Sequence, residues 1–169
     1  MKRLLCLLLI AAAMLSLAGC GTSPADDSVT FFYARPMADY RYGEPDGVIA
    51  SEYRDAAGHM DDLEYLLSLY LHGPVDESLI SPFPAGTQLE QLSWKESILT
   101  IQLSSGLSSL QGSDLTLACT CIAKTCFELT EATVVIVTTH GSDSVSLRFT
   151  RDSLLLSDGS PQSTPQESE

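Results

Sequence analysis

The sequence predicts an α+β fold, with one mixed β-sheet and two helices packed on one face of it, in a βαββαβ-like order. Two segments repeat apolar residues at helical spacing, and several shorter segments are β-branched or alternate apolar and polar residues. Their order along the chain is strand, helix, hairpin, helix, strand, with room for one more strand after each half. Such an order builds one mixed sheet covered by helices on one side.

The first half of the domain contains a strand at residues 29–33 and a peripheral strand at residues 47–54. A helix follows, in which Asp61 and Glu64 predict a capping box and Gly73-Pro74 predicts the end. Its apolar stripe has the spacing i, i+3, i+4, i+7, i+8 and consists of Leu63, Leu66, Leu67, Tyr70 and Leu71.

The second half begins with a hairpin whose strands are residues 88–94 and 98–103. A second helix follows, and its inward stripe is Leu115, Cys119, Ile122, Cys126 and Leu129. Residues 133–138 are nearly all β-branched, which is typical of a central strand. A last strand is predicted from the alternation of Val145, Leu147 and Phe149.

The N-terminus has the pattern of a secretory signal, because Lys2 and Arg3 precede an uncharged apolar run that ends in small residues before Cys20. The run Leu17-Ala18-Gly19-Cys20 resembles the bacterial lipobox. This resemblance implies cleavage before Cys20, diacylglycerol on its thiol and, in some bacteria, acylation of the new amino terminus. An ordinary signal peptide or a retained hydrophobic helix is the alternative.

The lipobox divides the chain into a removed signal peptide (1–19), a lipidated tether (20–28), a domain (29–156) and a disordered acidic, serine-rich tail (157–169). Without Lys2 and Arg3 the chain has seven basic and 22 acidic residues, a net charge of −15. This charge argues against a nucleic-acid partner, and anionic head groups would repel it. The lipid on Cys20 is therefore the expected membrane contact, at the outer face of the bacterial cytoplasmic membrane.

Three cysteines remain in the domain, Cys119, Cys121 and Cys126. On a helix, Cys119 and Cys126 would lie about 10 Å apart along the axis, which is too far for a disulfide. We expect free thiols packed as small apolar groups. A metal site of the form Cys-x-Cys-x4-Cys is the alternative, although no histidine is near it in the sequence.

The sequence offers no catalytic constellation. It has no Gly-x-Ser-x-Gly elbow and no glycine-rich loop after a strand, and its paired acids are neighbours in sequence. Asp61, Asp62 and Glu64 have a structural role at a helix N-terminus, which we prefer to metal binding. We therefore expect no enzyme, no cofactor, no metal and no known small-molecule substrate.

All six tyrosines lie between residues 33 and 70, together with three of the basic residues. Tyrosine and arginine are typical of interface hot spots. We hypothesise that Arg35, Tyr40, Arg41 and Tyr42 form a partner-binding surface. The alternative is that Tyr65 and Tyr70 belong to a helix and the other tyrosines cover an irregular hairpin.

Several segments together resemble the GerMN (sporulation and spore germination) domain. The resemblance covers about residues 28–150 and rests on 66–74, the run Ser81-Pro82-Phe83-Pro84-Ala85-Gly86-Thr87, the strand ending at 101–105, and 115–119. It implies a small α+β unit similar to ring-building motifs, without established enzymatic activity. Two positions depart from the family pattern: the hairpin turn is Glu96-Ser97 instead of Asp-Gly, and Gln102 replaces an acid.

The sequence therefore predicts a membrane-anchored, non-catalytic lipoprotein with a single GerMN-like domain that binds another protein or itself. The resemblance implies a role in sporulation, spore germination or envelope maintenance. The alternative function is a lipoprotein that binds a small ligand or peptidoglycan.

Overall fold

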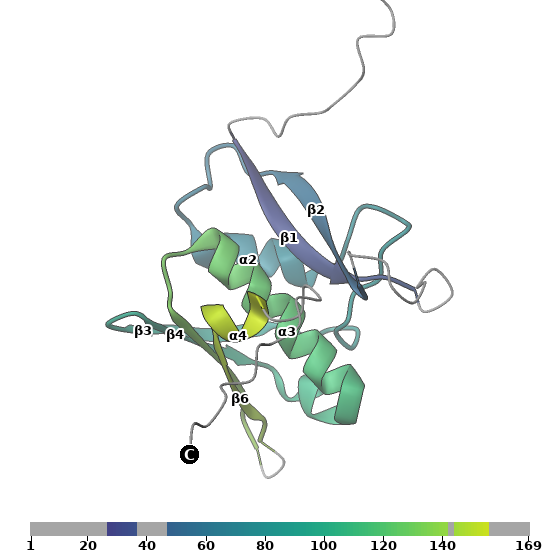
Figure 1. The fold of residues 1–169 in the computed structure, drawn as a ribbon, viewed down its shortest axis with the longest axis vertical. Helices are drawn as coiled ribbons and strands as arrows, with labels where there is room; N and C mark the ends of the chain where they lie inside the picture. Colours follow the sequence, from purple (N-terminus) through teal and green to yellow (C-terminus); the bar gives the residue numbers. More distant parts are fainter. Residues whose placement is uncertain (1–26, 37–46, 142–143, 156–169) are drawn as a thin grey trace, which may run out of the picture.

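The computed structural model describes residues 27–36, 47–141 and 144–155, which form two sheets and two main helices (Figure 1). No helix within these ranges is long and apolar enough to cross a membrane. The elements, labelled as in Figure 1, are β1 (Ser28–Ala34), β2 (Ile49–Asp55), α2 (Leu63–Leu71), β3 (Leu89–Lys95), β4 (Ile98–Leu103), the 3₁₀ helix η2 (Ser105–Ser109), α3 (Gly112–Leu129), β5 (Val134–Thr139), β6 (Ser146–Thr150) and α4 (Arg151–Leu155).

The larger sheet has four strands in the order β3-β4-β5-β6. β4 and β5 are parallel, whereas the β3–β4 and β5–β6 pairs are antiparallel. A parallel pair needs a long crossover connection, which η2 and α3 supply. The inner face of the two central strands is fully buried and consists of Leu99, Ile101, Leu103, Val135 and Val137. The predicted α+β class and mixed sheet are confirmed.

The first two strands were expected to join that sheet, but they do not. β1 and β2 pair antiparallel in a separate two-stranded sheet, from Ser28 opposite Asp55 to Ala34 opposite Ile49. The other edge of β1 lies against α3, where the Phe32 N–H donates to Thr125 Oγ1 at 3.0 Å. A helix therefore covers the edge at which a further strand would have to pair.

Helix α3 packs on two sides, against β1 and against β5 and β6 (Figure 1). The predicted stripe is buried at Cys119, Ile122 and Cys126 and partly buried at Leu115 and Leu129. A second set, Ala118, Cys121 and Thr125, is equally buried and shares one helix face by its spacing. These small side chains let the backbone of β1 approach α3 closely.

Helix α2 begins one residue later than expected. Its N-cap is Asp62, whose side chain accepts from the Tyr65 N–H at 3.0 Å, so the predicted capping box of Asp61 and Glu64 is wrong. Leu66, Leu67 and Tyr70 are buried as predicted. Gly73, with φ of +97°, follows the C-cap His72 and ends the helix.

The β3–β4 hairpin turns through Glu96 and Ser97, as predicted. Glu96 is the one non-glycine residue with positive φ among those described, at +57°. In this turn φ is positive at the first turn residue and not at the second, as in a type II′ turn. Glycine is favoured at the first position of such a turn.

Candidate functional site

The junction of β1, α2 and α3 is closed by side-chain hydrogen bonds. Tyr70 Oη donates to the Phe32 carbonyl at 2.8 Å, and Tyr33 Oη donates to the Tyr70 carbonyl at 2.9 Å. The rings of Tyr33 and Tyr70 stack with their centroids 4.9 Å apart. Farther along β1, Ala34 exchanges two backbone hydrogen bonds with Ile80. At Phe32 and Ala34, the edge of β1 is thus unavailable to an added strand.

A carboxylate beside this junction holds the loop after α2. Glu52 is 8% exposed and pairs with the Arg54 guanidinium. It also accepts from the N–H groups of Val75 at 2.9 Å and Asp76 at 2.8 Å. Arg54 Nη2 donates to the Gly73 carbonyl at 2.6 Å. Both charged groups of this pair therefore stabilise the turn at Gly73-Pro74, which gives them a structural role.

Two tyrosines and the three domain cysteines are buried in their neutral forms. Burial raises the pKa of Tyr33 and of Tyr70 above the ordinary value. It raises the pKa of Cys119 and of Cys121 to about 12, and the pKa of Cys126 also rises. Because the thiolate is the nucleophile, these cysteines are poor nucleophiles at neutral pH.

All three domain cysteines are free, as predicted. No group of three or more His, Cys, Asp or Glu side chains is placed to hold a metal ion in the described part of the chain. Cys121 faces the β1 side of α3 together with Thr125, whereas Cys119 and Cys126 lie on the stripe toward the larger sheet.

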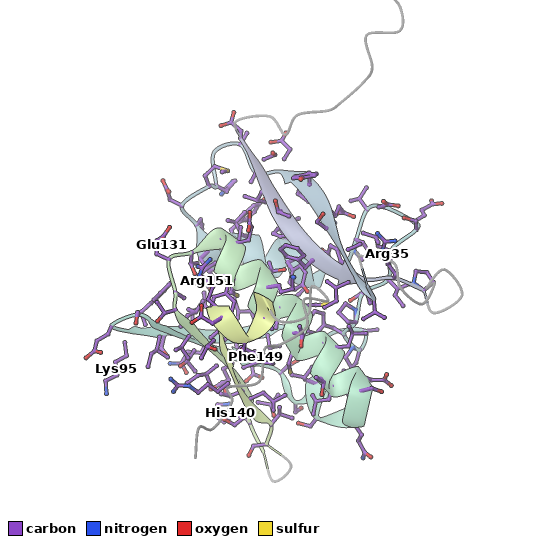
Figure 2. The ribbon with its side chains drawn as sticks, viewed as in Figure 1. Arg35, Lys95, Glu131, His140, Phe149 and Arg151 are labelled. Carbon is purple, nitrogen blue, oxygen red and sulfur yellow. The ribbon has the colours of Figure 1, made fainter. Side chains whose placement is uncertain are left out.

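Of the predicted site residues, the structure describes Arg35 alone. Arg35 follows Ala34, the last residue of β1, and its N–H donates to the Val48 carbonyl at 2.9 Å. Arg35 and Lys95 lie on opposite sides of the molecule in the view of Figure 2. Tyr40, Arg41, Tyr42 and the lipidation residue Cys20 lie outside the described residues. The structure therefore does not test whether the four predicted partner-binding residues share one surface.

An open groove of about 660 Å³ lies between α2 and the loop that follows residue 80. Its shape is fixed by local bonds, since Thr87 Oγ1 donates to the Pro84 carbonyl at 2.8 Å and the Phe83 N–H donates to Ser81 Oγ at 3.3 Å. His72 is its one titratable lining residue, with Nδ1 2.7 Å from the Ser68 carbonyl oxygen. We call it the loop groove; it is lined by Ser68, Leu71, His72, Ser81, Phe83, Pro84, Ala85, Gly86, Thr87, Gln88 and Leu89.

The lining of the loop groove combines apolar side chains with hydroxyl and amide groups, which is typical of a ligand site. Its one titratable side chain is His72. The sequence indicated half of the groove through the run 81–87, but the contribution of α2 could not be predicted, because Ser68 and Leu71 also fit an ordinary helix surface.

Comparison with protein-family models identifies one family. Residues 31–145 match the family described as Germane, sporulation and spore germination. The fold is similar to the tandem GerMN domains of the sporulation protein GerM from Bacillus subtilis, with a TM-score of 0.50 and 18% identity over 74% of this chain and 44% of that one. The chain thus spans less than half of that structure.

A second solved structure is a Clostridium perfringens protein assigned as a lipoprotein. It has a TM-score of 0.42 and 16% identity, and the match covers 77% of this chain and 94% of that one. No curated protein sequence matches the chain.

Proposed function

The chain belongs to the Germane family of sporulation and spore germination domains, and on this premise we propose that it is a lipoprotein anchored through Cys20 whose domain binds another protein without catalysis. Its place is the outer face of the bacterial cytoplasmic membrane. Its role is in sporulation, spore germination or envelope maintenance. The family description names sporulation and spore germination.

One observation carries the non-catalytic part of this proposal. The deeply buried polar groups of the domain hold the fold: Glu52 and Tyr70 bond to backbone groups of neighbouring segments. A catalytic acid or base needs a side chain that is free to exchange a proton with a substrate. The surface, with its grooves and acidic residues, is what remains for function.

The anchor is supported by the position of Cys20 relative to the folded domain. Six residues separate Cys20 from Asp27, the first described residue. Fully extended, this stretch spans about 25 Å. A lipid on Cys20 would therefore hold the start of β1 close to the membrane although the net charge of the chain is negative.

Cys20→Ala tests the anchor. The variant should leave the membrane fraction and keep the melting temperature of the domain, because residue 20 precedes the first strand. A Cys6→Ala variant is the matched control, since that cysteine lies in the predicted signal peptide. Full activity of soluble Cys20→Ala protein, or its retention in the membrane, would contradict the proposal.

The segment with Arg35, Tyr40, Arg41 and Tyr42, which follows β1 in the sequence, remains our proposed partner surface. Changing all four residues to alanine should abolish capture of the partner and leave the melting temperature nearly unchanged. A large fall in the melting temperature would show instead that the segment belongs to the core.

A second candidate function, binding of a small ligand or of peptidoglycan, is favoured by the loop groove. If glycan binds there, the protein should co-sediment with purified peptidoglycan. Ser68→Phe, which would fill the groove, should then abolish co-sedimentation, whereas Ser78→Phe on an exposed loop should not. Equal sedimentation of both variants would exclude the groove as the glycan site.

A further inference from the structure

A second groove lies between the N-terminal end of α2, the edge strand β3 and the C-terminal end of α3. It has a volume of about 280 Å³, and five of its seven lining residues are apolar, although polar atoms make up more than half of its exposed lining. We call it the Trp94 groove; it is lined by Met60, Asp61, Leu63, Leu66, Trp94, Leu129 and Thr130. A shallower hollow of about 400 Å³ shares Met60 and Asp61 with it and extends along residues 58–62.

Large apolar side chains are exposed around this groove. Trp94 is 51% exposed, Met60 is 40% exposed and Tyr65 is 42% exposed. Tyr65 stacks on His59, which lines the shared hollow, with ring centroids 3.9 Å apart. Trp, Tyr and Met are the residues enriched in the cores of protein interfaces, so this groove has the composition of a docking site.

The rim of the groove is acidic, and we define it as Asp61, which lines the groove, and Asp62, which lines the shared hollow. Both side chains are exposed, and neither forms an ion pair with a described residue. The N-terminal end of α2 offsets only about half an elementary charge of the two. The rim therefore keeps a net charge of about −1.5, which favours a positively charged occupant.

Nearby cations among the described residues do not neutralise this rim. Lys95 follows Trp94 in β3, and successive side chains of a strand point to opposite faces of the sheet. Arg151, which lies beside Glu131 in Figure 2, donates to the carbonyls of Thr130 at 2.8 Å and Ala132 at 3.2 Å. Its guanidinium also covers the Phe127 ring, with 5.2 Å from Cζ to the ring centroid.

We propose that the Trp94 groove binds a basic segment of a partner protein, with an aliphatic side chain against Trp94 and Met60 and flanking Lys or Arg side chains on the acidic rim. This inference rests on the proposed function, because it gives the interaction domain a surface in addition to the proposed segment with Arg35, Tyr40, Arg41 and Tyr42, and one class of partner. A second copy of this chain fits less well, because two surfaces from a chain with net charge −13 repel each other.

The single tryptophan of the chain makes the groove directly observable. The full chain would be titrated in detergent solution, without vesicles, with a peptide in which one leucine is flanked by lysines. Transfer of Trp94 from water to a covered site should shift its fluorescence emission to shorter wavelength in a saturable way. A peptide with glutamate in place of lysine should cause no shift.

Two variants separate the charge and the apolar contributions. Asp61→Asn with Asp62→Asn keeps the helix cap, because asparagine caps as well as aspartate, and should weaken binding at least fivefold. Glu77→Gln with Asp114→Asn removes the same charge elsewhere and should leave binding within twofold. Met60→Gln keeps the rim and should also weaken binding.

Three results would overturn this inference. The first is an equal emission shift with the glutamate peptide, and the second is unchanged affinity of the Asp61→Asn, Asp62→Asn variant for the lysine peptide. The third is an emission shift that grows with protein concentration in the absence of peptide, which would identify a second copy as the occupant. None of these measurements depends on lipid at Cys20. A negative result for binding at the groove would therefore not contradict the anchor proposal. A negative result for the anchor would not contradict binding at the groove.

Discussion

The junction of β1, α2 and α3 and the Trp94 groove contain similar side chains, but those at the junction are bonded within the fold and those at the groove are exposed. Both combine aromatic rings with polar groups, but at the junction Tyr70 and Thr125 bond to the backbone of Phe32. At the groove, Trp94 is half exposed and Asp61 has no ion-pair partner among the described residues. The difference indicates that the junction holds the fold and that the groove is available to a partner.

Alkaline pH should have the largest effect, because it destabilises the fold through the buried thiols of α3. The thiols of α3 have a pKa of about 12 at Cys119 and Cys121 in the folded protein, compared with about 8.5 in an unfolded chain. Their contribution to stability is complete below pH 8.5 and is lost as pH rises toward 12, because only the unfolded chain then releases the protons. We expect a loss of about 1.4 kcal/mol per thiol for each pH unit above 8.5.

Urea unfolding between pH 7 and pH 10 measures this slope. Cys119→Ala with Cys126→Ala should reduce it by about two thirds, because two of the three buried thiols are removed. A slope that does not change in this variant would show that the thiols titrate normally and that α3 is less enclosed than the structure indicates.

Removing the Glu52 carboxylate should have the next largest effect. Glu52→Ala leaves Arg54 and two backbone N–H groups without their acceptor. We expect the free energy of unfolding to fall by about 3 kcal/mol. Glu77→Ala, at an exposed position of the following loop, is the matched control and should change it by less than about 0.5 kcal/mol. Equal effects of the two changes would contradict the structural role of Glu52.

Thr125→Val tests the contact between α3 and β1. The substitution preserves side-chain shape but leaves the Phe32 N–H without its acceptor. A loss of about 1 to 2 kcal/mol is expected from chemical denaturation. Thr120→Val, on the same helix, should cost less, and an equal cost would mean that the hydrogen bond adds nothing.

Glu96→Gly should have the smallest effect and the opposite sign. Glycine adopts the positive φ of this turn without the steric cost that glutamate has there. The variant should gain about 0.5 to 1 kcal/mol in the free energy of unfolding. Its Trp94 emission should not change, because the turn lies beyond the groove lining. A loss of stability would show that the Glu96 side chain makes a contact of its own.

The sequence was sufficient for the two main helices and the strands, but it did not predict the short helices η2 and α4. Apolar spacing identified both main helices, alternation identified the hairpin and β6, and β-branched residues identified β5. The N-cap of α2 lies one residue after the predicted one, because Asp61 and Asp62 are adjacent and either can accept from a backbone N–H. The separate sheet of β1 and β2 was not predictable, because no local pattern says which edge a helix will cover.

The second face of α3 and the Trp94 groove were missed for different reasons. Ala118, Cys121 and Thr125 are small and weakly apolar, so they do not form a recognisable hydrophobic stripe. Trp94 looked like an ordinary strand residue, and its exposure depends on the distance between β3 and two helices that are remote in sequence. Sites assembled from several elements become visible only when those elements are placed in space.

A photoreactive amino acid at position 60, in living cells that make the protein, tests the central claim most directly. Met60 is exposed and lines the groove, so the account predicts one adduct with a partner protein, joined through a segment rich in lysine or arginine, and its loss in the Asp61→Asn, Asp62→Asn variant. The same photoreactive group at Val75, which is 73% exposed, should not form this adduct. An adduct with a second copy of the chain, or the same adduct from both positions, would contradict the account.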